Sequence, residues 1–134
     1  MQILNAFLAQ DLEELEDGTL NVFGILGGLR VTAVPYQEPL INLFVHFSAN
    51  PGEVRTEKLI DVELWEADGD LMKRFQTTVT VPDARRTGIR SDFNVNLPLE
   101  NVPFIHAGDY GFNILVEGIE RTIPFYISVE EGET

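Results

Sequence analysis

The segment HAGDYGFNILVEG, residues 106–118, contains one of only two histidines in the chain, and Asp109 follows His106 by three residues. An imidazole beside a carboxylate can transfer protons or hold a metal ion. The same residues also fit a structural role, in which Gly108 and Asp109 lead the chain into a strand and the Tyr110 hydroxyl bonds a nearby backbone group. The regular alternation after Tyr110 favours the structural role, so we predict scaffold here and no catalytic residue.

Three carboxylates surround the Asp68-Gly69 pair in EADGD, residues 66–70. Carboxylate oxygens suit Ca²⁺, but this ion takes roughly six to eight oxygens and only three carboxylates are local. The acidic segment 11–17 would have to converge on the turn to complete a site. An Asp-Gly pair between two strand patterns is the usual signal of a hairpin. We therefore predict a solvated hairpin turn, with no metal ligands and no cofactor.

The segment DARRTGIR gathers three of the nine basic residues, Arg85, Arg86 and Arg90. Guanidinium groups bind anions and acidic side chains through paired hydrogen bonds, so this loop is a candidate anion-binding site. The competing interpretation is a solvated loop whose arginines pair with nearby carboxylates.

Three large apolar side chains fall on the polar faces of their strand patterns: Phe44, Trp65 and Met72. Exposed aromatic groups on a sheet can form a contact surface for a partner protein. They can equally be covered by a loop of the same chain, and the sequence leaves both alternatives open.

The elements that must position these residues are β-strands, because most of the chain alternates with a period of two. One clear example is LINLFVHFS, whose apolar face consists of Ile41, Leu43, Val45 and Phe47. Eight strands are predicted near residues 2–11, 19–33, 40–48, 58–67, 70–81, 90–99, 109–117 and 120–129. The turn signals between them are typical of an all-β fold, a two-sheet antiparallel β-sandwich that is Ig-like or jelly-roll-like. We predict a single domain over residues 1–134, with a frayed acidic tail from about residue 130.

Two turns add detail to this fold. The Asp68-Gly69 turn predicts a register in which Val62 faces Phe75 and Glu63 faces Arg74. The segment GILGG, residues 24–28, lacks the lysine and hydroxyl residue of a phosphate-binding loop. Its glycines therefore indicate a bulge or bend within the second strand.

The opening residues fit an amphipathic helix as well as a strand, and their pattern alone does not separate the two. Together, the segments ILNAFLAQDLEELEDGTLNVFGIL, LWEADGDLM and HAGDYGFNILVEGIERTIPF resemble a family of small uncharacterised bacterial all-β proteins, known as a domain of unknown function. The resemblance spans nearly the whole chain. It implies that residues 2–11 form a strand that runs through an acidic-Gly turn into a second strand, and it implies no catalytic residue.

Composition narrows the classes of function. The 134 residues include 22 acidic and 9 basic ones, for a formal net charge of −13, so we expect no nucleic-acid partner. The chain has no cysteine, which excludes a disulfide framework and a thiolate nucleophile. No apolar run approaches the roughly 18 residues of a membrane span, and the start lacks the basic region of a secretory signal. We therefore predict a cytoplasmic protein with no membrane partner.

These observations favour a non-catalytic intracellular module, which binds an unknown protein partner or takes part in assembly, over an enzyme. Self-association into a homo-oligomer is left open. The alternative is a lectin-like module that binds carbohydrate or calcium, for which Trp65, Phe44 and the acidic turn would serve.

Overall fold

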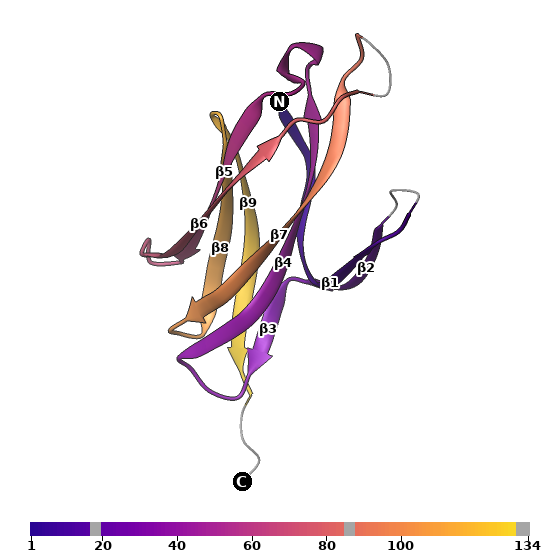
Figure 1. Ribbon diagram of the computed structural model, residues 1–134. Coiled ribbons are helices and arrows are strands. Elements are labelled where there is room, and N and C mark those ends of the chain that lie inside the picture. Colours follow the sequence, from indigo (N-terminus) through magenta and orange to yellow (C-terminus); the bar gives the residue numbers. More distant parts are fainter. Residues whose placement is uncertain (17–19, 85–87, 131–134) are drawn as a thin grey trace.

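Two β-sheets packed face to face form the fold of this protein (Figure 1). The computed structural model describes residues 1–16, 20–84 and 88–130. The strands are β1 (Gln2–Glu14), β2 (Leu20–Leu26), β3 (Gly28–Val31), β4 (Tyr36–Ala49), β5 (Glu57–Glu66), β6 (Leu71–Thr80), β7 (Ser91–Phe104), β8 (Gly108–Val116) and β9 (Ile119–Val129), and a short 3-10 helix, η1 (Pro51–Glu53), lies between β4 and β5. Across these residues no helix is long and apolar enough to cross a membrane. The predicted frayed tail lies, apart from Glu130, outside the described residues.

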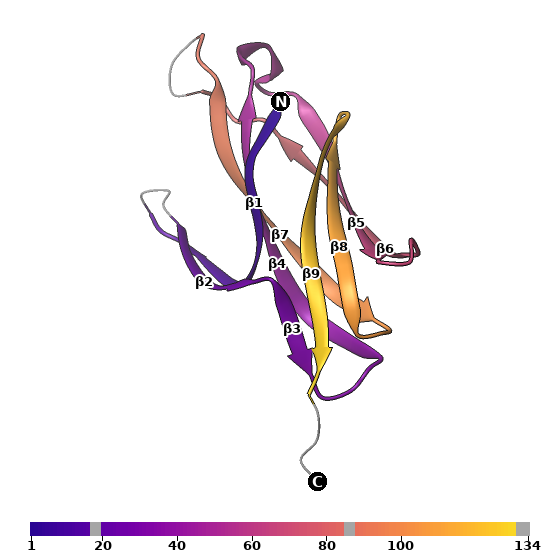
Figure 2. The ribbon, with the colours of Figure 1, turned by 180° about the vertical axis from the view of Figure 1, so that it is seen from behind.

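The predicted all-β sandwich is confirmed, with nine strands where about eight were expected. One sheet has the strand order β2-β1-β4-β7 and the other β3-β9-β8-β5-β6. Views from the front and from behind show the two layers (Figures 1 and 2). Neighbouring strands are antiparallel with one exception, because β3 runs parallel to β9. The expectation of a wholly antiparallel sandwich is therefore wrong at this pair.

The hydrophobic core lies between the two layers. The face of β4 that the alternation predicted to be apolar is 0% exposed at all four positions, Ile41, Leu43, Val45 and Phe47. Aromatic rings meet in this core. Phe104 of β7 stacks on Phe125 of β9 across the two sheets at 5.6 Å between centroids, and Phe125 also meets Phe112 of β8, in its own sheet, edge-on at 5.4 Å. Burying one such side chain stabilises a protein by about 1.5–3 kcal/mol, so this cluster is a main contact between the layers.

The register of β5 and β6 is the one that the Asp68-Gly69 turn predicts. Val62 faces Phe75 and Glu63 faces Arg74, whose Nη2 lies 2.7 Å from Glu63 Oε2. The pairing shifts between Leu64, which faces Lys73, and Trp65, which faces Leu71, so Met72 of β6 is the extra residue of a β-bulge.

The opening residues form a strand, as the resemblance implied, and the helical alternative is wrong. β1 pairs with β4 between Gln2 and Ala9, and with β2 between Leu8 and Glu14. Beyond Ala9, β1 and β2 continue as a two-stranded hairpin that projects from the sandwich in both views (Figures 1 and 2). We name residues 10–14 of β1 and 20–25 of β2 the arm.

The single strand predicted over residues 19–33 is two strands that belong to different sheets. β2 ends at Leu26 and β3 begins at Gly28, so the chain crosses between the layers within GILGG. A Cβ atom at Gly28 would collide with the carbonyl oxygen of Tyr126 on β9, so only glycine permits this close approach. The predicted bend is present as well, because Gly24 has a φ of +66°.

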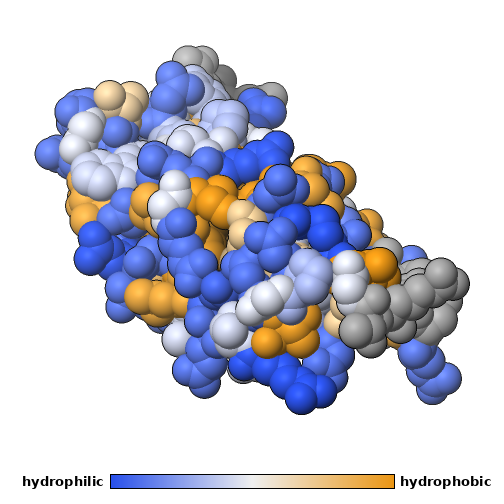
Figure 3. Space-filling view, turned by 90° about the horizontal axis from the view of Figure 1, so that it is seen from above, coloured by the Kyte–Doolittle hydropathy of each residue, from blue (hydrophilic) through white to orange (hydrophobic). Residues whose placement is uncertain are grey.

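Charged groups meet at the end of the sandwich where the N-terminus lies. The Lys58 side chain is only 7% exposed, and its Nζ lies 3.0 Å from Glu53 Oε2 and 2.9 Å from Glu117 Oε2. The amino group of Met1 donates to Glu53 Oε1 at 2.9 Å. This bond, with further bonds from the Asn50 backbone and Lys58, lowers the pKa of Glu53 to about 2. Seen from this end, the surface is largely hydrophilic, with hydrophobic side chains in separate groups (Figure 3).

Candidate functional site

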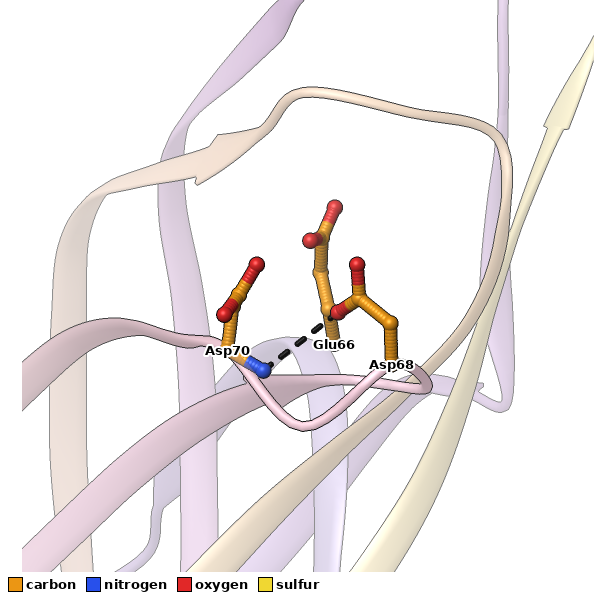
Figure 4. A group of neighbouring side chains, drawn as sticks. All are labelled: Glu66, Asp68 and Asp70. Carbon is orange, nitrogen blue, oxygen red and sulfur yellow. Dashed lines mark hydrogen bonds between the residues drawn. The ribbon is translucent and has the colours of Figure 1, made fainter.

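The three carboxylates of the β5–β6 turn converge. Glu66, Asp68 and Asp70 each offer an oxygen within 4.8 Å of the other two, and Figure 4 shows them pointing to the same side of the turn. The turn itself is held by backbone hydrogen bonds, with Gly69 N–H donating to Glu66 O at 3.0 Å. A φ of +95° at Gly69 explains why glycine occupies this position. Three oxygens are at most about half of a calcium shell.

The second acidic segment does not complete such a shell in the described chain. Its residues Asp11–Glu14 lie on β1 at the arm, on the opposite side of the molecule from the β5–β6 turn in both ribbon views (Figures 1 and 2). Asp17 lies outside the described residues. The convergence that the sequence left open is therefore absent from the part of the acidic segment that the structure describes.

A hollow of about 220 Å³ lies between the acidic turn and the residues that precede β8. Its lining consists of Glu66, Ala67, Asp68, His106, Ala107, Gly108, Asp109 and Tyr110. Ala67 N–H donates to the Asp109 carbonyl oxygen at 3.1 Å, which ties the turn to the start of β8. Two segments that the sequence suggested separately, EADGD and HAGDY, thus share one surface.

At this surface the Tyr110 hydroxyl has a structural role, because it forms hydrogen bonds with the backbone of the loop. It donates to the His106 carbonyl oxygen at 2.6 Å and accepts from His106 N–H at 3.1 Å. Burial, assisted by the charge of Glu66, raises the pKa of Tyr110. The side chains of His106 and Asp109 are exposed, and no hydrogen bond or ion pair between them occurs among the described residues. The predicted scaffold role of Tyr110 is confirmed.

Of the three apolar residues predicted to face outward, Phe44 is covered. It is 7% exposed because the ring of Phe7 on β1 stacks on it at 4.6 Å between centroids. The cover is thus a neighbouring strand, not a loop, and the interpretation of Phe44 as an exposed contact residue is corrected. Met72, at the bulge of β6, is half-buried and packs in part against the core.

Trp65 remains on the outer face of the five-stranded sheet, where it is half-buried. It belongs to a row that crosses four strands: Leu71, Trp65, Gly111 and Pro124. Its Nε1–H donates to Glu63 Oε1 at 3.4 Å, a long bond. Gly111 lies directly opposite Trp65 on β8, and a Cβ atom there would meet only the Thr122 Cγ2 methyl group, at 3.2 Å.

Of the three predicted anion-binding arginines, the structure describes Arg90, whereas Arg85 and Arg86 lie outside the described residues. Arg90 Nε donates to Ser48 Oγ at 2.7 Å and Nη2 to the Ser48 carbonyl oxygen at 3.0 Å, while Nη1 donates to Asn50 Oδ1. These bonds tie the start of β7 to the end of β4. The hollow of about 430 Å³ beside Arg90 is also lined by Asp83 and Asp92, whose charges disfavour an anion.

The arm carries the most exposed apolar side chain of the described chain. Ile25 is 68% exposed and Phe23 is 49% exposed, and both belong to β2, on either side of Gly24. β2 is the last strand of its sheet, so alternate backbone N–H and C=O groups along it point away from β1. The arm therefore combines apolar side chains with an open hydrogen-bonding edge.

A family of unknown function, DUF6941, matches residues 4–128. The chain belongs to the DUF6941 family. The match covers nearly all of it, from β1 into β9, and so includes the arm. No curated protein matches this DUF6941 chain.

The arm is the feature that sequence reasoning missed in this DUF6941 chain. A signal was present, because residues 18–29 contain no charged side chain although the chain carries 31 charged residues, 22 acidic and 9 basic. Alternation alone could not reveal it, since a strand pattern does not show whether a partner covers the strand.

Proposed function

We propose that this protein is a non-catalytic binding or assembly module, and that the arm is the surface that contacts its protein partner. The observation that carries the proposal is the exposure of Phe23 and Ile25 on a projecting, uncharged strand. Burying such side chains contributes about 1.5–3 kcal/mol each, so a partner that covers them gains affinity. Apolar groups gathered on a surface mark interaction sites more often than isolated ones do.

The position of the arm supports the same conclusion. A two-stranded hairpin is only marginally stable by itself, because it has no second layer on which to pack. Past Ala9 the arm loses its pairing with β4 and therefore relies on its own two strands. A partner strand or surface would supply the missing layer, which is a physical reason for the arm to bind.

The setting that we propose is a bacterial cytoplasm. The net charge of −13 repels nucleic acid, and a chain without cysteine has no disulfide that a reducing environment could break. The partner is therefore proposed to be a protein whose contact surface is apolar.

The test is capture of partners from host lysate by the immobilised chain and by the double variant Phe23→Ser/Ile25→Ser. The matched control is Leu59→Ser/Tyr126→Ser, which removes one aliphatic and one aromatic side chain of similar exposure, 48% and 52%, from the five-stranded sheet. We expect the arm variant to lose specific proteins that the wild type and the control retain. Retention of the same proteins by the arm variant would contradict the proposal.

The alternative, a lectin-like module that binds calcium or carbohydrate, has one observation in its favour. The carboxylates of Glu66, Asp68 and Asp70 converge in the turn that follows the half-exposed Trp65 in the chain. Its test, calcium titration, is described in the Discussion.

A further inference from the structure

We propose that the arm pairs with the arm of a second copy of this chain, β2 against β2 in antiparallel orientation. The two four-stranded sheets would then form one sheet of eight strands across a two-fold axis. This inference rests on the proposed function of the arm and names its partner. Symmetric pairing of this kind buries the same strand in both subunits, so the strand must be complementary to itself.

The four sheet edges differ in how they are protected against such pairing. Prolines, charged side chains and short length are the usual means of protecting an edge. β7 contains Pro98 and Pro103, and β3 has four residues, among them the exposed Arg30. β2 has seven residues, four of them before the bend at Gly24, and contains neither a proline nor a charge. Among the described edges, β2 is the one without a proline or a charged side chain.

On the other side of the sandwich, a lysine side chain links the two edge strands, β6 and β7. Lys73 of β6 donates to the carbonyl oxygens of Glu100 and Asn101 on β7, at 3.0 Å each. An inward-pointing charge of this kind is a known device against edge pairing. Because β6 and β7 are thus linked within one chain, the open edge lies on the side of β2.

The distribution of charge also distinguishes the edge of β2 from the rest of the surface. A surface with a net charge of −13 opposes contact between two copies wherever acidic side chains meet. Residues 18–29 contain no charge, so β2 can approach its copy without that cost. The acidic Asp11 and Glu13 lie on β1, one strand further from the axis. Across the pair, β1 and its copy are separated by three strand spacings, about 14 Å, which exceeds the screening length of about 8–10 Å.

The symmetry also restricts the register. Residues directly opposite in an antiparallel pair point to the same face, so a two-fold axis through the sheet must place one residue opposite its own copy. Gly24 bends β2, which leaves Leu20–Phe23 as its regular part. We therefore place the axis in that part of β2, at one of residues 21–23, each of which has a strand neighbour on both sides. A contact limited to one strand pair is small, so we expect a reversible dimer whose fraction rises with concentration.

The first test is the oligomeric state, measured by sedimentation over a concentration series, for the wild type and Asn21→Lys. A lysine at this exposed edge position should prevent pairing, whereas within one chain it faces Glu13 and gains an opposite charge. The controls add the same charge elsewhere: Gln37→Lys on β4 and Thr78→Lys on the β6 edge, both at exposed positions. We expect dimers for the wild type and both controls, and monomers for Asn21→Lys.

The second test uses the absence of cysteine from the chain. Single variants Asn21→Cys, Val22→Cys and Phe23→Cys are oxidised mildly. The residue on the axis lies about 4.5–5.5 Å from its copy between Cα atoms, within the roughly 4.4–6.8 Å that a disulfide requires. A residue one position away is separated from its copy by about 8 Å and falls outside this range. We expect one of the three variants to cross-link efficiently.

A monomeric wild type, a dimer that survives Asn21→Lys, or cross-linking by none of the three variants would each overturn the pairing. The failure of the proposed function gives a different result. If the wild type is monomeric yet loses a lysate protein through Phe23→Ser/Ile25→Ser, the arm binds another protein and only the pairing with a second copy is wrong. If the wild type is monomeric and Phe23→Ser/Ile25→Ser captures the same lysate proteins as the wild type, both proposals are wrong.

Discussion

The hydroxyl oxygen of Tyr110 lies 2.6 Å from the carbonyl oxygen of His106, four residues before it in the chain. The bond closes the loop between β7 and β8 and leaves the imidazole of His106 outside it, exposed to solvent. Histidine at this position is therefore held by its backbone, and its side chain contributes nothing that the fold requires.

Three substitutions in this segment should reduce the free energy of unfolding by different amounts. Phe112→Ala opens a cavity at a fully buried position and should reduce the free energy of unfolding by about 3–5 kcal/mol. Tyr110→Phe removes one hydroxyl and should cost about 1–3 kcal/mol, because it leaves His106 backbone groups without their partner. His106→Ala should change stability by less than about 0.5 kcal/mol. Urea denaturation measures all three, and loss of a bound partner by a stable His106→Ala variant would show a functional site here.

The ion pairs of Glu53 predict a dependence of stability on pH. The pKa of Glu53 is about 2 in the folded protein, against an ordinary value of 4.5. A carboxyl group whose pKa is lowered by folding stabilises the protein above its unfolded pKa, and this contribution is lost as the pH falls through the folded pKa. The difference in unfolding free energy between the wild type and Glu53→Gln should therefore shrink between about pH 5 and pH 2.

Urea titrations at a series of pH values measure this difference. Glu57→Gln, which changes the same charge at an exposed position of β5, is the control and should show a much weaker dependence. An equal difference at pH 2 and pH 7 for Glu53→Gln would disprove the role assigned to the pair.

Calcium should leave the melting temperature nearly unchanged. A site of micromolar affinity would stabilise the fold by about 4 kcal/mol at a thousandfold excess of calcium, but the acidic turn offers three carboxylates, too few to hold the ion tightly. Thermal unfolding with and without millimolar calcium measures the effect. A clear rise that disappears in Asp68→Asn/Asp70→Asn would instead support the calcium-binding alternative.

The crossing between the sheets can be tested at two adjacent glycines. Gly28→Ala places a Cβ against the Tyr126 carbonyl oxygen and should destabilise the protein by about 1–3 kcal/mol. Gly27→Ala meets no atom within 4 Å and should be neutral or stabilising by up to about 1 kcal/mol, since alanine restricts the unfolded chain. Equal effects of the two substitutions in chemical denaturation would contradict the close approach of β3 and β9.

The sequence was informative where the environment of a residue depends on its own strand or on a tight turn. The apolar face of β4, from Ile41 to Phe47, is buried as predicted, and the Asp68-Gly69 turn determines which residue of β6 faces Val62. Such patterns follow from the two-residue period of a strand and the geometry of a short hairpin, both of which are local.

Prediction failed where a distant strand or a one-residue irregularity decided the outcome. The cover over Phe44 comes from Phe7, 37 positions earlier, and no property of β4 itself reveals it. A single bulge lets Met72 pack in part against the core, because the extra residue locally disrupts the alternation of the strand. The exposure of the arm could not be predicted because it also depends on distant strands, which leave β2 uncovered.

The parallel pairing of β3 with β9 has a consequence for the order of events during synthesis. β9 lies between β3 and β8, so the interior of this sheet contains a strand that is made after both of its neighbours. Until residues 119–129 emerge, β3 has no neighbour in that sheet, and one edge of β8 is without its partner strand. Nascent chains of this protein therefore present unfinished strand edges until β9 is made, the interval in which a ribosome-associated chaperone would have the most surface to hold.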